Sequence, residues 1–410
     1  MKFLLPVPDH PPRPVDFSYC LNVHPGETLA DLQHVLHTHL PDIRSALAPT
    51  PDTPFGLGLR IAREAATALN TPRALADLQA QLQAQQLYAF TVNAFPYGAF
   101  HQTRVKENVY APDWRTPERF TYTRDVFDIL SRLLPPDTAG SVSTVPLSYA
   151  AWPLSAADRA QMRRHFIELT QHLARIEAQT GSLLHLGLEP EPDCTLETTP
   201  QTLAWFENEL FRHAAQEMAA LDHTTPAQAE ALFRRHIGIC FDTCHVAMQF
   251  EDPAAALRAY TRAGIRISKV QLSAALEVAP TPTPPEHLRD FDDGVYLHQC
   301  KSANGQSWPD LPRRLADPHP YTHPLRIHCH VPLHWPGDTL RQTTRHTLQP
   351  DFFAALGQSD CQHIEVETYT FNVLPPDLQT TTLTENIIHE CQWAQQNLQL
   401  IAEHSPVATH

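Results

Sequence analysis

Glycine is scarce in this chain, with 13 glycines among 410 residues. There is no Gly-x-Gly-x-x-Gly motif and no other glycine-rich loop that would cradle a phosphate, so a dinucleotide-binding fold is excluded. Long apolar runs are also missing: without a run of about 18 apolar residues, the sequence predicts no transmembrane helix. The opening stretch "MKFLLPVPDHPPRP" is interrupted by prolines too early to form the core of a signal peptide.

Positive charge is limited as well. Lys and Arg number 30 against 45 Asp and Glu, which gives a net charge of −15. Nucleic acids and anionic membrane surfaces are bound by basic faces, so we expect no nucleic-acid partner and no membrane insertion. The eight cysteines are scattered singly, which excludes a disulfide framework and favours a reducing, cytoplasmic location. The only close pair, Cys240 and Cys244, lacks the second pair that a structural zinc site needs.

Strand-like runs alternate with helical runs along the whole chain. The eight strand-like units span residues 17–25, 55–61, 88–96, 140–149, 182–192, 237–246, 265–276 and 363–371. Helical patterns between them include 28–47, 71–86, 199–222 and a closing helix over 383–403, and Thr71-Pro72 is a typical helix start. Such alternation predicts a parallel sheet with helices outside, and eight units predict a (β/α)8 TIM barrel made by a single domain, residues 1–410.

One segment interrupts the alternation between the seventh and eighth strands. About ninety residues separate "KVQLSAAL" from "HIEVETYT", far more than a usual connection. Within it, "LRIHCHVPLH" alternates so that Arg326, His328 and His330 share one face. We therefore expect an insertion over residues 277–335, an extra strand or hairpin lying over the mouth of the barrel.

Active sites of such barrels lie at the carboxyl ends of the strands. The strand ends and the insertion present polar or aromatic residues there: Asn22, His24, Arg60, Asn93, Phe95, Tyr97, Glu189, Glu191, Asp242, His245, Gln271, Ser273, Glu365, Glu367, His328 and His330. The alternation of side chains along strands five and eight points Glu189, Glu365 and Glu367 into the barrel. Carboxylates are costly to bury without a partner, and a divalent metal ion would remove that cost.

Asp242 and His245 end strand six at the same edge. Together with Glu189 and Glu367 they would form a mixed oxygen and nitrogen site, which suits Mn²⁺, Co²⁺, Fe²⁺ or Zn²⁺ better than Ca²⁺. Each motif alone has a simpler interpretation: Asp-x-x-His as a helix cap, Glu-Pro-Glu-Pro as an exposed loop, His-x-His as an edge strand, Arg60 as the partner of a carboxylate. The joint placement at the ends of strands five, six and eight favours a site.

Six segments carry a resemblance to a known family. They are Tyr19–Leu29, Phe55–Ile61, Phe90–Arg115, Phe241–Glu251, His328–His334 and His363–Thr370. In these segments the chain resembles the xylose-isomerase-like barrel superfamily of sugar-phosphate isomerases and epimerases, and more closely the EboE "metabolite traffic protein" family of ebo gene clusters. The resemblance implies a cytoplasmic protein that handles a small-molecule metabolite, with other ebo-cluster proteins as partners.

The resemblance to the superfamily also implies a ligand set. Its metal is held by residues that correspond to Glu189, Asp242 and Glu367, and by a histidine of strand seven. Here that position is Gln271, so either Gln271 or a histidine of the insertion, His328 or His330, completes the set.

The chemistry that this resemblance implies is isomerisation or epimerisation. A metal that binds both oxygens of an α-hydroxy carbonyl acidifies the carbon-bound proton, and Glu189 and Glu367 would act as the acid/base pair. His245 would meet substrate oxygens.

Other residues are candidates for substrate binding. Asn22, Arg60 and Asn93 are expected to bind the substrate, and Lys106, with Arg115, an anionic group on it. Two alternatives remain open: a metal-dependent hydrolase with more than one metal, and a barrel that binds a metabolite without catalysis.

Overall fold

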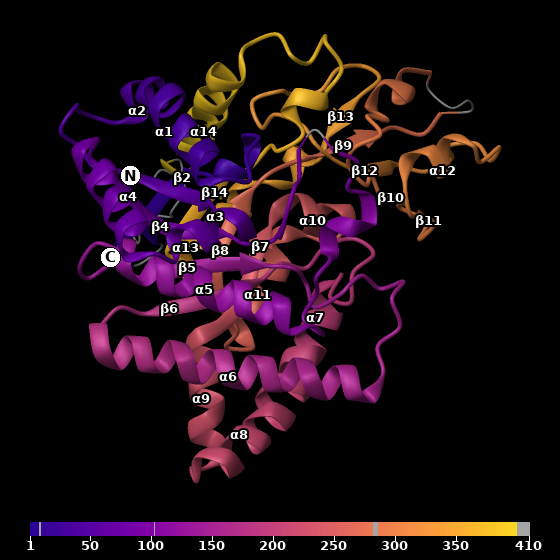
Figure 1. Cartoon of the computed structure of the whole chain (residues 1–410). Helices are drawn as coiled ribbons and strands as arrows, with labels where there is room; N and C mark the ends of the chain where they lie inside the picture. Colours follow the sequence, from indigo (N-terminus) through magenta and orange to yellow (C-terminus); the bar gives the residue numbers. More distant parts are fainter. Residues whose placement is uncertain (8–9, 102, 282–285, 400–410) are drawn as a thin grey trace, which may run out of the picture.

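The computed structural model describes residues 1–7, 10–101, 103–281 and 286–399 (Figure 1). Its main sheet contains β2 (His10–Tyr19), β3 (Phe55–Arg60), β4 (Leu87–Asn93), β5 (Gly140–Thr144), β6 (Leu184–Leu188), β7 (Ile237–Asp242), β8 (Arg266–Leu272) and β14 (His363–Val366). These strands are parallel and follow the order β2-β14-β8-β7-β6-β5-β4-β3. A parallel bridge between Cys20 and Gly58 joins the two ends of this order. The predicted eight-stranded α/β barrel is therefore confirmed.

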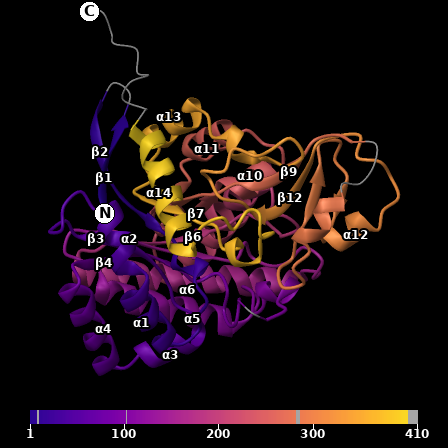
Figure 2. The same cartoon turned by 90° about the horizontal axis from the view of Figure 1, so that it is seen from above.

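Helices surround the barrel between consecutive strands (Figures 1 and 2). They are α1 (Leu29–Thr38), α2 (Leu40–Leu47), α3 (Arg63–Leu69), α4 (Pro72–Ala84), α5 (Pro117–Leu133), α6 (Ala156–Thr180), α7 (Thr199–Trp205), α8 (Ala215–Asp222), α9 (Pro226–His236), α10 (Thr243–Met248), α11 (Pro253–Arg262), α13 (Pro350–Gln358) and α14 (Leu383–Gln399). Within the described residues, no helix combines the length and the apolar composition needed to cross a membrane.

Several helices begin with a threonine N-cap followed by a proline in the first turn. Thr71 accepts a hydrogen bond from the Ala74 amide, and Pro72 occupies the first turn, as the sequence predicts. The predicted helix 28–47 is divided into α1 and α2 by His39, and the predicted helix 199–222 passes through a π-helical segment, η3 (Phe206–Ala214). Residues 400–403 of the predicted closing helix lie outside the described residues.

The N-terminal segment forms a strand that the sequence does not predict. β1 (Lys2–Val7) pairs antiparallel with the first part of β2, for example Leu4 with Pro14. The many prolines of this stretch disguise it, because proline is usually excluded from the interior of a sheet. At an edge, however, the missing amide donor costs no ladder hydrogen bond.

The insertion after β8 is a second sheet rather than a single hairpin. Its five strands follow the order β11 (Ser307–Trp308), β10 (Cys300–Ser302), β12 (Leu325–His330), β9 (Ala275–Val278) and β13 (Gln342–Thr343), and α12 (Leu311–Leu315) accompanies them. Both views show this sheet beside one end of the barrel (Figures 1 and 2). Of the predicted insertion, 277–335, residues 282–285 lie outside the described residues; the sheet itself extends from Ala275 to Thr343.

The interior of the barrel is polar beneath the carboxyl ends of the strands. Lys269 and Glu365 form an ion pair of 2.5 Å with neither side chain exposed. Deeper in, His363 stacks on His185 at a centroid distance of 5.4 Å, and its Nδ1 lies 2.8 Å from the Ser141 hydroxyl. All eight cysteines are buried and none is in a disulfide.

Candidate functional site

A pocket opens where the barrel strands end and the second sheet begins. It is lined by Asn22, Asn93, Phe95, Pro96, Phe100, Val105, Lys106, Val109, Glu189, Glu191, His245, Tyr296, Leu297, His328, Glu367 and Tyr369. Its empty volume, the open mouth included, is about 500 Å³, within the range of small-molecule sites. Polar side chains come mainly from the barrel strands and β12, and apolar side chains from the loop after β4 and from residues 295–297.

Three carboxylates converge beside this pocket, and two of them, Glu189 and Glu367, line it. Glu189 follows β6, Asp242 ends β7 and Glu367 follows β14, and one oxygen from each lies within 4.8 Å of the other two. All three side chains are buried. Burial, together with the neighbouring carboxylates, raises the pKa of Glu189 and of Glu367 well above the usual range. Burial and the neighbouring charges thus disfavour the ionised forms of both groups, and a bound divalent ion would offset this.

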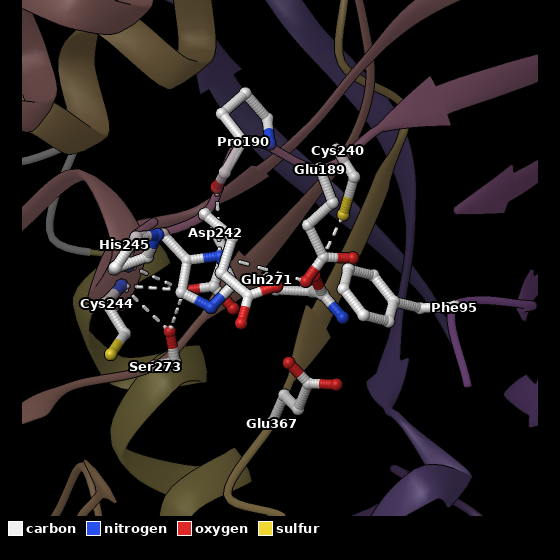
Figure 3. A network of polar contacts seen from close by, with 12 residues as sticks. Phe95, Glu189, Pro190, Cys240, Asp242, Cys244, His245, Gln271, Ser273 and Glu367 are labelled. Carbon is white, nitrogen blue, oxygen red and sulfur yellow. Dashed lines mark hydrogen bonds and ion pairs between the residues drawn. The ribbon is translucent and has the colours of Figure 1, made fainter. Parts of the chain in front are cut away.

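Asp242 combines two roles that the sequence presents as alternatives. Its Oδ1 accepts hydrogen bonds from the amides of Cys244 (2.7 Å) and His245 (3.2 Å) and from the Ser273 hydroxyl (2.6 Å), so it caps α10 (Figure 3). Its Oδ2 is buried without a hydrogen-bond partner. Burial opposes ionisation, yet the nearby imidazoles and these hydrogen bonds keep the pKa of Asp242 below its usual value. One oxygen thus holds the helix and the other remains available to a ligand.

Three histidines around the site have a fixed tautomer. The Nδ1 atoms of His245, His328 and His330 lie 3.0, 2.8 and 2.9 Å from the oxygens of Pro190, Gln299 and Glu367, respectively. Because carbonyl oxygens only accept, each Nδ1 carries a hydrogen. Burial lowers the pKa of all three imidazoles, that of His330 to about 4. The rings are therefore neutral, and each presents an Nε2 lone pair.

These three histidines belong to two adjacent groups of possible metal ligands. The Nε2 of His330 has no partner, and ligand atoms of His330, Asp242 and His245 lie within 4.8 Å of one another. The Nε2 atoms of His245 and His328 face each other at 3.1 Å, and the two rings form a second group with Glu191. Two facing lone pairs repel each other unless a proton or a cation lies between them.

Gln271 occupies the strand position where the resembled superfamily has a histidine. Its Oε1 accepts from the Cys240 thiol at 2.8 Å, and its Nε2 is buried without a partner (Figure 3). An amide nitrogen is a donor, so in this orientation Gln271 offers a hydrogen bond and no ligand atom. His330 of β12, the alternative ligand considered from the sequence, has the free ring nitrogen instead.

The residues present fit a divalent transition-metal ion. Glu189 Oε2, Asp242 Oδ2 and His330 Nε2 are all buried without a hydrogen-bond partner. Buried polar atoms are normally satisfied, so three unsatisfied atoms in one site indicate a missing binding partner. Carboxylate oxygens with an imidazole nitrogen are ligands typical of manganese, cobalt, iron or zinc.

The predicted substrate-binding residues are divided among different places. Asn22 and Asn93 line the pocket, and both donate to Glu367 Oε1, the latter at 3.4 Å. Lys106 also lines the pocket, but its ammonium is 2.7 Å from Asp310.

The other predicted cations point elsewhere. Arg60 does not line this pocket: its guanidinium donates to the Gly26 and Gly98 carbonyls beside a separate, smaller hollow. Arg115 pairs with Asp113 at 2.8 Å. Of the three cations that the sequence predicts for substrate binding, Arg60, Lys106 and Arg115, only Lys106 is among the described residues that line the pocket.

Most of the apolar residues that line the pocket are not predicted from the sequence. Phe100, Val105, Tyr296, Leu297 and Tyr369 line the pocket from loops and short irregular segments. Such segments have no helical or strand periodicity, so the sequence does not predict which of their side chains point into the pocket. Only the cluster of aromatic residues in 90–100 gives a signal in the sequence.

Comparison with known proteins identifies no family for this chain. No family model matches the chain, and no curated protein matches it. Among solved structures, the chain is similar to an L-ribulose 3-epimerase (10% identity, TM-score 0.49, 97% of this chain and 98% of that one). It is also similar to a putative sugar phosphate isomerase/epimerase from Anabaena variabilis (12%, TM-score 0.48, 94% and 99%) and to the IOLI protein with a zinc atom (12%, TM-score 0.44, 96% and 100%). Because these TM-scores are below 0.5, the fold assignment rests on the strand order and closure described above.

Proposed function

We propose that the chain is a metal-dependent isomerase or epimerase of a small hydroxy-carbonyl compound such as a sugar or polyol. The observation that supports it most is the convergence of Glu189, Asp242 and Glu367 at one end of the barrel, each within 4.8 Å of the others. Glu189, Asp242, Glu367 and His330 would hold the ion. When bound, the ion would polarise a substrate carbonyl and so acidify the adjacent carbon-bound proton.

The protein's own groups account for the proton transfers. Glu189 and Glu367 come from strands that are not neighbours in the sheet, so the two carboxylates approach a ligand from different sides. One takes a proton from carbon and the other returns one. Asn22 and Asn93 orient the Glu367 carboxylate through its Oε1. His245 lines the pocket with its Nε2 beside that of His328, and substrate oxygens would approach this pair of rings.

The biological setting is a further part of the proposal. The resemblance of six segments to the EboE family supports a role in processing or moving the precursor of a secreted metabolite. Under this proposal the ligand is a small molecule, and other proteins of the same gene cluster are the expected partners.

Metal content of the purified protein tests the proposal. We expect about one transition-metal ion per chain, lost in Glu189→Gln and Asp242→Asn and retained in Glu207→Gln, whose carboxylate is exposed. Sugars would then be screened for exchange of a carbon-bound proton in deuterated water. Absence of metal from all four proteins, even after reconstitution, would contradict the isomerase assignment.

A second candidate, a metal-dependent hydrolase, is favoured by the facing imidazoles. Glu191, His245 and His328 form a second possible ligand group beside the first. Two ions per chain, one of them lost in His328→Gln, would favour hydrolysis. A metal-loaded protein that binds sugars without proton exchange or hydrolysis would instead be a metabolite-binding barrel.

A further inference from the structure

Part of the lining of the pocket belongs to a small, separate hydrophobic cluster. Phe100, Val105 and Tyr296 are its buried members, with Val109 and Tyr369 packed against it. The rings of Phe100, Tyr296 and Tyr369 contact one another, with all three centroid distances at 5.2 Å. Apolar side chains that line the same pocket as polar groups suit a ligand that has both a polar and an apolar part.

Two distant segments of the chain hold this cluster together. The loop after β4 supplies Phe100 and Val105, and the second sheet's segment 295–297 supplies Tyr296. The amides of Val105 and Lys106 donate to the Val295 carbonyl at 3.1 and 3.2 Å. The Tyr296 hydroxyl lies 2.5 Å from His101 Nδ1. The apolar wall is thus built into the fold.

The same region neutralises the cation best placed to bind an anionic substrate. Lys106 lines the pocket, but its Nζ lies 2.7 Å from Asp310 Oδ2. Asp310 is held in turn, because its Oδ1 accepts from the His298 and Leu311 amides at 3.0 Å each. Across the described residues that line the pocket, no other lysine or arginine occurs, whereas Glu189, Glu191 and Glu367 do.

We infer that the natural ligand is an uncharged hydroxy-carbonyl or polyol that carries an apolar substituent and no phosphate. This inference rests on the proposed function, because the polar head is placed at the carboxylates. The substituent would lie against the cluster of Phe100, Val105 and Tyr296. A phosphate would meet carboxylates and a lysine already paired, so its desolvation would not be compensated.

Three hydroxamates test the inference, because each presents the same two oxygens as an α-hydroxy carbonyl. They are acetohydroxamate, 4-phenylbutyrohydroxamate and phosphoglycolohydroxamate, titrated by calorimetry into the full chain reconstituted with Co²⁺, whose visible spectrum also reports binding. We expect the phenyl compound to bind at least about 10-fold more tightly than acetohydroxamate, since a buried ring adds apolar contact. Phosphoglycolohydroxamate should bind no more tightly than acetohydroxamate.

Two variants locate the effect. Phe100→Ala should reduce the affinity ratio of the phenyl compound to acetohydroxamate several-fold. Asp310→Asn should release Lys106 and strengthen binding of phosphoglycolohydroxamate about 10-fold. If the wild-type protein prefers the phosphorylated compound, the inference is wrong although the proposed function stands. If no hydroxamate binds or changes the spectrum, the proposed function itself fails, and the inference with it.

Discussion

Lys269 and Glu365 face each other inside the barrel, Nζ to Oε2 at 2.5 Å, with neither side chain exposed. They belong to the neighbouring strands β8 and β14, directly below the residues of the candidate site. Burial opposes the charge of Lys269, but the Glu365 carboxylate outweighs it and raises the lysine pKa. The Glu365 carboxylate therefore already has a cation, and the candidate metal site is formed without it.

Removing one partner of this pair should destabilise the fold strongly. We expect Glu365→Gln to lower the free energy of unfolding by about 3–5 kcal/mol, because a buried ammonium would be left unpaired. The double variant Lys269→Met, Glu365→Leu should recover much of the loss. Urea unfolding followed by circular dichroism measures both. Asp351→Asn, which breaks a largely exposed pair with Arg258, is the control, and it should cost less than about 1 kcal/mol.

Gly58 should be intolerant of a side chain. A Cβ at this position would lie 1.4 Å from Glu365 Oε1 and 3.1 Å from the Tyr19 carbonyl oxygen. Gly58→Ala would have to displace a paired carboxylate at the point where the barrel closes, so we expect a loss of at least about 2 kcal/mol in thermal or urea unfolding. Gly98→Ala is the matched control, since no atom lies within 4 Å of its Cβ. Equal stability of the two variants would argue against the tight closure described here.

Glu390 should make stability fall as pH rises. It is buried in α14, where it accepts from the Leu333 amide (2.9 Å), the Thr368 hydroxyl (2.6 Å) and the Asn386 amide group (2.7 Å). Burial raises its pKa from 4.5 to about 7. The folded state therefore holds a proton that the unfolded state releases, and this contribution, about 3 kcal/mol, is present below pH 4.5 and lost by about pH 7.

Glu390→Gln isolates that contribution. The glutamine mimics the protonated carboxyl. Its NH2 replaces the oxygen that now accepts from Asn386 Nδ2, so the Asn386 amide must turn over and present its unpartnered Oδ1 as the acceptor. We expect the variant to be more stable than the wild type at pH 8, with a flatter profile between pH 4.5 and 7. Urea denaturation at a series of pH values gives the comparison. Parallel profiles for the two proteins would mean that Glu390 is ionised in the folded state throughout.

His330 should contribute to metal affinity. Since its free Nε2 lies beside Asp242, His330→Gln should weaken metal binding by at least about 100-fold, more than the loss of a typical outer-shell partner. Competition with a chromogenic chelator measures the affinity directly. His346→Gln, which changes an exposed histidine, should leave it unchanged. An unaltered affinity in His330→Gln would exclude His330 as a ligand.

The barrel could be predicted because each of its strands is a short apolar run bounded by a helical pattern, for example 237–242 before α10. What could not be predicted depends on contacts between segments distant in the sequence. β1 is concealed by prolines that only an edge position tolerates, and the short strands β10, β11 and β13 have too few residues to show alternation. The division of the helix 28–47 at His39, by contrast, has a signal in the sequence, because Pro41 in the first turn of α2 cannot continue the preceding helix.

The candidate site shows the same limit. Strand ends indicate Glu189, Asp242 and Glu367, because position in a parallel strand determines where they meet. Lys269 shares the inward face of its strand with Gln271, so its pairing with Glu365 was within reach of the same argument. The partner of Lys106, Asp310, lies over two hundred residues away in an irregular segment, where no periodicity predicts its direction.

The distribution of the candidate ligands along the chain affects the order of synthesis and folding. Glu189 and Asp242 are made first, His330 follows in the second sheet, and Glu367 comes with the last strand of the barrel. Until that strand has left the ribosome, the nascent barrel has an unclosed seam between β2 and β8 and an incomplete set of ligands. The addition of β14 therefore closes the barrel and completes the candidate ligand set in the same late step of folding.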